Sequence, residues 1–110
     1  MSKVIIDLPT FDSSKWCICD QIPKIIEELN ELLEAFGFDG CSDDKVKNHN
    51  ILSELLDLTQ ACKTGIEIFE NKLGSQFVAL ALQAHREKLE ERHRTGKIKL
   101  LMEEEGVSVE

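Results

Sequence analysis

Long hydrophobic runs and an export signal are both missing from this sequence. No apolar stretch reaches the roughly 18 residues that a membrane-spanning helix needs. The first residues, Met1–Asp7, are too short and too soon acidic for a signal peptide, so we expect a cytoplasmic protein. Both absences argue against a membrane as the main partner.

Basic residues are scarce as well. The 110 residues include 13 Lys and Arg against 21 Asp and Glu, which gives a formal net charge of −8. Phosphate contacts along a nucleic acid need clustered Lys and Arg, so this balance argues against a nucleic-acid partner. A small phosphorylated ligand is compatible with it, because bound divalent cations invert the local charge.

Several common site motifs are absent. The four cysteines, at positions 17, 19, 41 and 62, lack the paired C-x-x-C spacing typical of zinc sites, and we expect reduced, buried and inert thiols. There is no G-x-x-x-x-G-K-[ST] loop and no recognisable signature of a Ser-His-Asp or Cys-His nucleophile. The three histidines lie in polar company and are assigned no metal.

The sequence does carry clear helical periodicity. Residues 1–12 are expected to form an irregular lead-in, and residues 12–14 offer N-cap side chains for a first helix. Pro23 predicts either a fresh start or a kink at that point, and Gly37 predicts the end of the helix. The apolar stripe of this helix consists of Ile25, Ile26, Leu29, Leu32, Leu33 and Phe36.

Two further helices follow. The second is expected over about residues 45–71, capped by one of residues 42–44, with a kink indicated at Gly65. The third is expected over about residues 75–94 and ends at Gly96. We predict an all-α protein, an antiparallel bundle of three to four helices completed by oligomerisation, because so short a chain builds only a thin core. The apolar stripe of the second helix consists of Ile51, Leu55, Leu58, Cys62, Ile66 and Phe69.

Two acidic pairs occupy matching positions on the first two helices. Glu28 and Glu31 take the same angular offsets from the first stripe that Glu54 and Asp57 take from the second. If the stripes pack antiparallel, the pairs meet at one edge of the seam, where the carboxylates need a counter-charge. Oxygen ligands in this number suit Mg²⁺, with Mn²⁺ as a substitute. The alternative is an ordinary solvated helix face.

The acidic spacing resembles the signature of the all-α nucleoside triphosphate pyrophosphohydrolases, the MazG-like group. Glu27-Glu28-x-x-Glu31 is followed, after a 22-residue gap, by Glu54-x-x-Asp57. The segments 21–26 and 85–94 are similar to this family as well, whereas Leu56 stands where the family usually has a small residue. Residues 13–98 are therefore expected to be a MazG-like domain, followed by an acidic tail over 99–110.

The resemblance implies an enzyme. Family members use Mg²⁺ to hydrolyse a nucleoside triphosphate to the monophosphate and pyrophosphate, and a deoxy or non-canonical substrate is expected. Lys88 and Arg92 would meet the triphosphate, unless they form an ordinary i, i+4 pair on a solvated face. Gln21 would read a base edge, and a homodimer or homotetramer is implied. The metal ligands carried over from the family are Glu28, Glu31, Glu54 and Asp57, whereas Glu27 points away and is held back.

Two alternatives stay open at this point. Trp16 either stacks on a nucleobase or, as we favour, anchors the core. The whole chain is either this enzyme or a non-catalytic module that binds a protein or a nucleotide. Off-stripe apolar residues would serve as partner contacts in such a module, namely Leu56, Ile68, Leu100 and Leu101.

Overall fold

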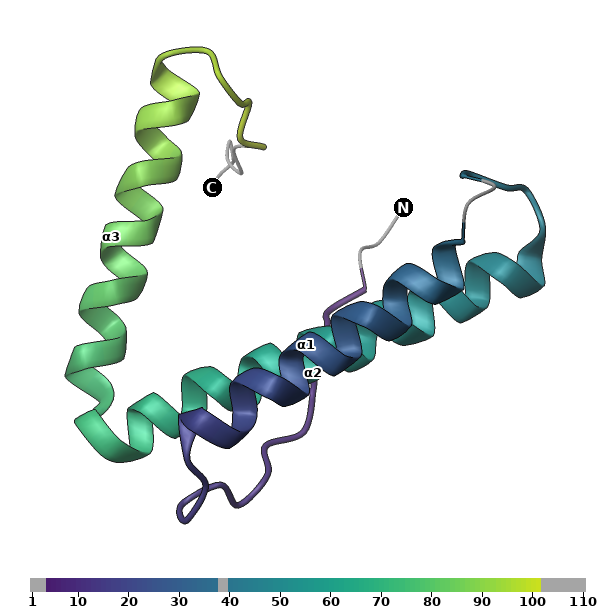
Figure 1. The fold of residues 1–110 in the computed structure, drawn as a ribbon. Coiled ribbons are helices and arrows are strands. Elements are labelled where there is room, and N and C mark those ends of the chain that lie inside the picture. The colour runs from purple at the N-terminus through teal and green to yellow at the C-terminus, as the bar shows by residue number, and fades with distance from the viewer. Residues whose placement is uncertain (1–3, 38–39, 102–110) are drawn as a thin grey trace. The chain divides into compact units, whose positions relative to one another are not determined.

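The computed structural model describes residues 4–37 and 40–101, and this part of the chain forms three helices and no strand (Figure 1). Helix α1 spans Ile18–Phe36, α2 spans Lys45–Leu73 and α3 spans Ser75–Arg94. The chain divides into two compact units, one that ends at Gly74 and one that begins at Ser75. None of the described helices is long and apolar enough to cross a membrane. The predicted all-α fold class is confirmed.

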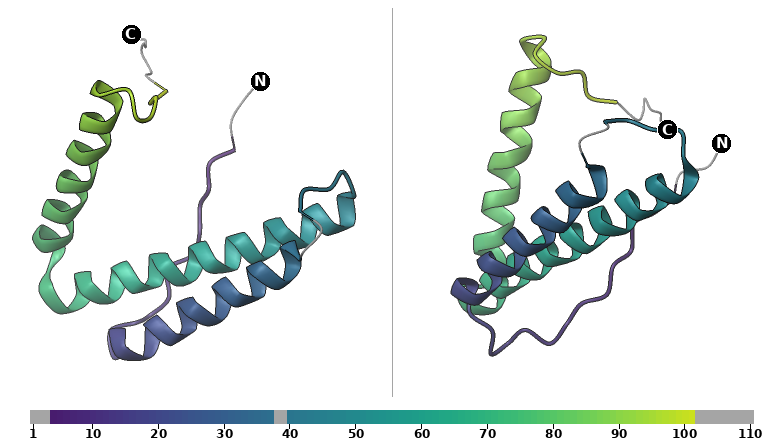
Figure 2. Two further views of the ribbon diagram at one scale, coloured as in Figure 1. Left: turned by 45° about the horizontal axis from the view of Figure 1, so that its top comes forward. Right: turned by 45° about the vertical axis from the view of Figure 1, so that its right-hand side comes forward.

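The first unit is built on an antiparallel pair of helices, α1 and α2, which lie side by side (Figures 1 and 2). The stop of α1 and the start of α2 follow the sequence signals. Gly37 has a φ of 71° and donates its N–H to the carbonyl of Leu33 at 3.0 Å. Asp44 caps α2, and its carboxylate accepts the N–H of Val46 at 3.0 Å.

The start of α1 differs from the prediction. The carboxylate of Asp12 accepts the N–H and the hydroxyl of Ser14 at 3.3 and 2.8 Å, so this group closes a turn before the helix instead of capping it. Cys17 is the N-cap, and its sulfur accepts the N–H of Cys19 at 3.3 Å. The helix then runs through Pro23 without a restart, at the cost of one backbone hydrogen bond.

The faces that α1 and α2 bury coincide only in part with the apolar stripes that the periodicity indicated. Half-buried members of these stripes are Ile25, Leu32, Ile51 and Leu58. Ala61 and Ile68 are the buried apolar side chains of the described residues, whereas Leu33 and Ile66 in the predicted stripes are 57% and 55% exposed. The buried positions of α1 are Gln21 and Glu28. On α1 these buried residues alternate with the half-buried Ile25 and Leu32, and this mixed row faces the small residues of α2. The buried positions of α2 are Ala61, Thr64, Gly65 and Ile68.

The exposed stripes of the two helices share one side of the pair. At about 100° per residue, each stripe lies roughly a quarter to a third of a turn from its buried row, in the same rotational sense on both helices. In an antiparallel pair, equal rotations bring both stripes to the same side. We call this side the apolar face, and its exposed members are Ile22, Ile26, Leu29, Leu33 and Phe36 of α1 and Leu55, Ile66, Phe69 and Leu73 of α2.

The second unit consists of α3 and the segment after it. Gly96, with a φ of 81°, and Lys97 donate their N–H groups to His93 and Arg92 at 3.1 and 2.9 Å, which closes the helix at the predicted place. The backbone of Leu100 then donates to Nδ1 of His93 at 3.0 Å. No residue of α3 is buried within the described residues. Most of the predicted acidic tail, residues 102–110, lies outside the described residues.

We expected buried cysteines, and this prediction is wrong. Cys17 is half-buried, and Cys19, Cys41 and Cys62 are exposed. Cys62 belongs to the stripe of α2 that faces away from α1, which is why the periodicity placed it wrongly in the core.

Candidate metal centre

Three predicted acids meet between α1 and α2. Glu28, Glu54 and Asp57 each offer one carboxylate oxygen, and these three oxygens lie within 4.8 Å of one another. Glu28 is buried at 7% exposure, Glu54 is half-buried and Asp57 is exposed. The prediction placed these acids at the edge of an apolar seam. Glu28 lies instead in the buried row of α1, and Glu54 and Asp57 meet it from α2.

Two of these carboxylates have an oxygen without a hydrogen-bond partner. Oε1 of Glu28 and Oε1 of Glu54 are buried and receive no hydrogen bond from any described residue. A buried carboxylate oxygen that accepts no hydrogen bond is energetically costly. Oxygen donors of this kind, converging from two helices, fit the ligand preference of Mg²⁺ or Mn²⁺.

Lys24 supplies part of the counter-charge. Its Nζ lies 2.8 Å from Oε2 of Glu28 and 3.1 Å from Oε1 of Glu27. Hydrogen bonds to Glu28 and then to Glu27 raise the pKa of Lys24 above its usual value, so the ammonium is charged at every physiological pH. Glu27 is exposed and faces Lys24, which agrees with leaving it outside the ligand set.

Glu31 is the fourth predicted ligand and is not one of the three converging carboxylates. It is close enough to them for the negative charge of Glu28, followed by desolvation and the charge of Glu54, to raise the pKa of Glu31. A fourth carboxylate therefore stands beside the cluster, and repulsion among these acids is already present in the metal-free protein.

A cavity opens next to the acids. It has a volume of about 380 Å³ and lies among the N-terminal segment, α1 and α2. Glu28 and Asp57 form one end of it, and Phe11 and Trp16 contribute aromatic rings whose centroids are 6.3 Å apart. Trp16 is 47% exposed, so the favoured role of a core anchor is wrong. The remaining lining residues are Gln21, Lys24, Gln60, Ala61 and Thr64.

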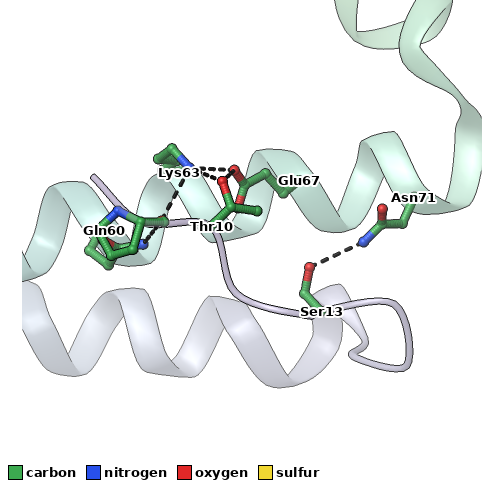
Figure 3. A network of polar contacts seen from close by, with 7 residues as sticks. Thr10, Ser13, Gln60, Lys63, Glu67 and Asn71 are labelled. Carbon is green, nitrogen blue, oxygen red and sulfur yellow. Dashed lines mark hydrogen bonds and ion pairs between the residues drawn. The ribbon is translucent and has the colours of Figure 1, made fainter. Parts of the chain in front are cut away.

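The N-terminal segment is held on α2 by polar contacts (Figure 3). Lys63 donates to the hydroxyl of Thr10 at 2.9 Å, and that hydroxyl donates to Glu67 at 3.2 Å. Asn71 donates to the hydroxyl of Ser13 at 3.1 Å, and the side chain of Ser13 is almost completely buried. Phe11 lies between Thr10 and Ser13, the two residues that are bonded to α2.

The predicted substrate residues have different surroundings. Gln21 lines the cavity, but its amide N–H group donates to the backbone carbonyl of Ala61 at 2.9 Å, so this donor holds α1 to α2. Lys88 and Arg92 are exposed on α3, one turn apart, in the second unit. Their contact with a triphosphate stays a prediction.

Three participants were missed by the sequence analysis. Lys24 precedes Glu28 by one helical turn, a spacing that could have revealed the ion pair. Thr64 follows Asp57 by two turns on the same face of α2, and its hydroxyl is buried without a hydrogen-bond partner. Phe11 could not have been found, because only the folded N-terminal segment brings it to the cavity.

The chain was also compared with known proteins. It matches no protein-family model, no curated protein and no solved structure.

Proposed function

We propose that this chain is a Mg²⁺-dependent nucleoside triphosphate pyrophosphohydrolase, acting on a deoxy or non-canonical nucleotide. The observation that carries the proposal is the convergence of Glu28, Glu54 and Asp57, whose oxygens lie within 4.8 Å beside a cavity. These are three of the four acids that the MazG-like resemblance marks as ligands. An acidic cluster alone is common on proteins, but this one includes two buried oxygens that lack donors.

Each acid would bind the cation from a different position. Glu28 and Glu54 would bind through their unpartnered oxygens, and Asp57 would bind from the mouth of the cavity. Lys24 fixes the second oxygen of Glu28 and thereby its rotamer. When bound, Mg²⁺ supplies charge neutralisation on the phosphates and activates a water. Glu31 would complete the set as the outer carboxylate.

The cavity would receive the nucleoside part of the substrate. Trp16 presents a partly exposed ring for stacking on a base, and Phe11 supports it. The unpartnered hydroxyl of Thr64 offers a hydrogen bond to a base edge or a sugar, and Gln21 lines the same cavity. Lys88 and Arg92, which lie in the second unit, would neutralise the triphosphate, as the resemblance implies.

A homodimer or homotetramer is part of this proposal. The apolar face exposes large side chains along most of α1 and α2, and monomeric proteins rarely leave such a stripe in water. A second copy is the occupant that fits best, because long amphipathic helices pack well into bundles through matching stripes. The same observation favours the alternative of a helical interaction module, which would use this face without any chemistry.

The test is product analysis on a panel of canonical, deoxy and modified nucleoside triphosphates with Mg²⁺ or Mn²⁺. At least one should yield the monophosphate and pyrophosphate. Glu54→Gln and Asp57→Asn should each lower kcat/KM by about 100-fold or more, because each removes a charged ligand while keeping its size. Glu34→Gln, on the solvent side of α1, is the matched control and should keep full activity.

Binding can be read separately from turnover. Trp16 is the single tryptophan of the chain, so its fluorescence reports directly on the cavity. Quenching by a nucleotide without product formation would identify a binding module. No quenching and no cleavage with any member of the panel would overturn the proposed function.

A further inference from the structure

Outside the metal centre, two thiols stand together at the start of α1. Cys17 is the N-cap, and Cys19 follows two residues later in the first turn. The N–H of Cys19 donates to the sulfur of Cys17 at 3.3 Å, and the carbonyl of Cys17 accepts the N–H groups of Asp20 and Gln21 at 3.0 and 3.1 Å. Both the sulfur and the carbonyl of Cys17 thus accept N–H groups of the first turn of α1.

The surroundings of Cys17 favour its thiolate. Hydrogen bonds from the backbone and then the thiol of Cys19 lower the pKa of Cys17, the charge of Lys72 lowers it further, and desolvation and Asp20 act against this. The helix N-terminus adds partial positive charge at the same point. The hydrogen bond between the two thiols and then the negative charge of Cys17 raise the pKa of Cys19. Of the two thiols, Cys17 is therefore the better nucleophile.

A reagent can reach this sulfur. Cys17 is half-buried and lines a cavity of about 260 Å³ together with Lys15, Lys72 and Asn71. The ammonium groups of Lys15 and Lys72, which line the same cavity as the Cys17 thiol, suit an anionic partner. Low-molecular-weight disulfides that carry carboxylates, such as glutathione disulfide, have this chemistry.

We propose that Cys17 and Cys19 form a redox-active dithiol that exchanges with low-molecular-weight disulfides. The thiolate of Cys17 attacks one sulfur of the disulfide, forms a mixed disulfide and expels the other half as a thiolate. Cys19 gives its proton to solvent and attacks the sulfur of Cys17. This second step forms the Cys17–Cys19 disulfide and expels the second thiolate, so one small disulfide is reduced to two thiols while the pair is oxidised.

Oxidation would change the start of α1. Disulfide formation would move the Cys17 sulfur that caps the helix. Trp16 and Gln21, on either side of the pair, line the cavity beside the acids. The redox state of the pair thus reaches the nucleotide cavity through the first turn of α1. The thiol chemistry itself does not depend on the proposed enzymatic function.

The chain contains its own control thiols, since Cys41 and Cys62 are exposed. The reduced full-length protein is treated with a small amount of 5,5′-dithiobis(2-nitrobenzoate) at neutral pH, quenched with acid, digested and mapped by mass spectrometry. Cys17 should react at least about threefold faster than Cys41 and Cys62, and this preference should vanish in urea. Lys72→Ala, a change at an exposed position, should slow Cys17 alone.

Glutathione disulfide then tests the second step. The wild type should accumulate a tryptic peptide of residues 16–24 that has lost two hydrogens, whereas Cys19→Ser should stop at the glutathione adduct on Cys17. Equal reaction rates of Cys17, Cys41 and Cys62 in the folded protein, or a wild type that stops at the adduct, would overturn the proposal. Neither result bears on triphosphate cleavage, which is measured with the thiols reduced.

Discussion

Glu28 is the residue in which the demands of packing and of the proposed chemistry meet. It occupies a buried position where an apolar side chain would normally give more stability, and one of its oxygens has no donor. Lys24 offsets only part of this cost, because it reaches the other oxygen. A residue that costs stability at a helix contact is a strong candidate for function.

Repulsion among the acids gives a pH-dependent prediction for Glu31→Gln. The pKa of Glu31 is raised above its ordinary 4.5 in the folded protein, so the folded state binds more protons and loses stability as the pH rises through this range. Glutamine carries no charge at this position, so the variant does not lose this stability as the pH rises. Without divalent cations, it should resist urea better than the wild type at about pH 7, and the difference should disappear at about pH 4.

The comparison is made by urea unfolding in the presence of a chelator and again with Mg²⁺. Added Mg²⁺ should stabilise the wild type more than the variant, because the variant lacks one carboxylate. A variant that is less stable than the wild type at neutral pH without metal would contradict the prediction. Glu34→Gln serves as the control and should change little.

At the scale of the elements, the contact between α1 and α2 depends on small residues. A methyl group added at Gly65 would lie 3.6 Å from Cδ1 of Ile25 and 3.7 Å from Cγ of Gln21, which is ordinary van der Waals contact. The glycine is therefore a weak point in the middle of a 29-residue helix and not a steric requirement. The predicted kink at this position is not needed, since α2 continues through it as one helix.

Gly65→Ala should consequently stabilise the protein by about 1 kcal/mol, because alanine loses less backbone freedom in a helix. Gly65→Leu should destabilise it by about 1–3 kcal/mol, because the larger side chain has no room against α1. Urea unfolding followed by circular dichroism measures both. An alanine variant that is less stable than the wild type would show that α1 packs too closely against Gly65 to accept a methyl group.

For the whole molecule, the small buried apolar set means that one chain has little core of its own. Ala61 and Ile68 are its buried apolar side chains among the described residues, while larger ones on the apolar face are in contact with water. Each large apolar side chain fully buried contributes roughly 1.5–3 kcal/mol. Association through this face would supply the stability that the antiparallel pair lacks.

Leu33→Lys should therefore weaken self-association, because it places a charge within the expected contact. Sedimentation analysis should show dimers or tetramers for the wild type and smaller species for the variant at micromolar concentration. Glu34→Lys, one residue further along and away from the apolar face, is the matched control and should assemble normally. A wild type that stays monomeric with folded helices at tens of micromolar would contradict this prediction.

The sequence by itself determined the three helices, the ends of the first and third at Gly37 and Gly96, a cap for the second among residues 42–44, and the spacing of the acids. These are local properties, set by backbone hydrogen bonding and by the 3.6-residue period. Only the tertiary structure decided which face of each helix is buried. Periodicity finds the most apolar stripe, whereas the burial of Gln21 and Glu28 depends on contacts across the helix pair with residues 61, 64 and 65 of α2. For the same reason the sequence could not show that Glu28 is buried, that Phe11 and Trp16 close the cavity, or that Cys17 caps the helix.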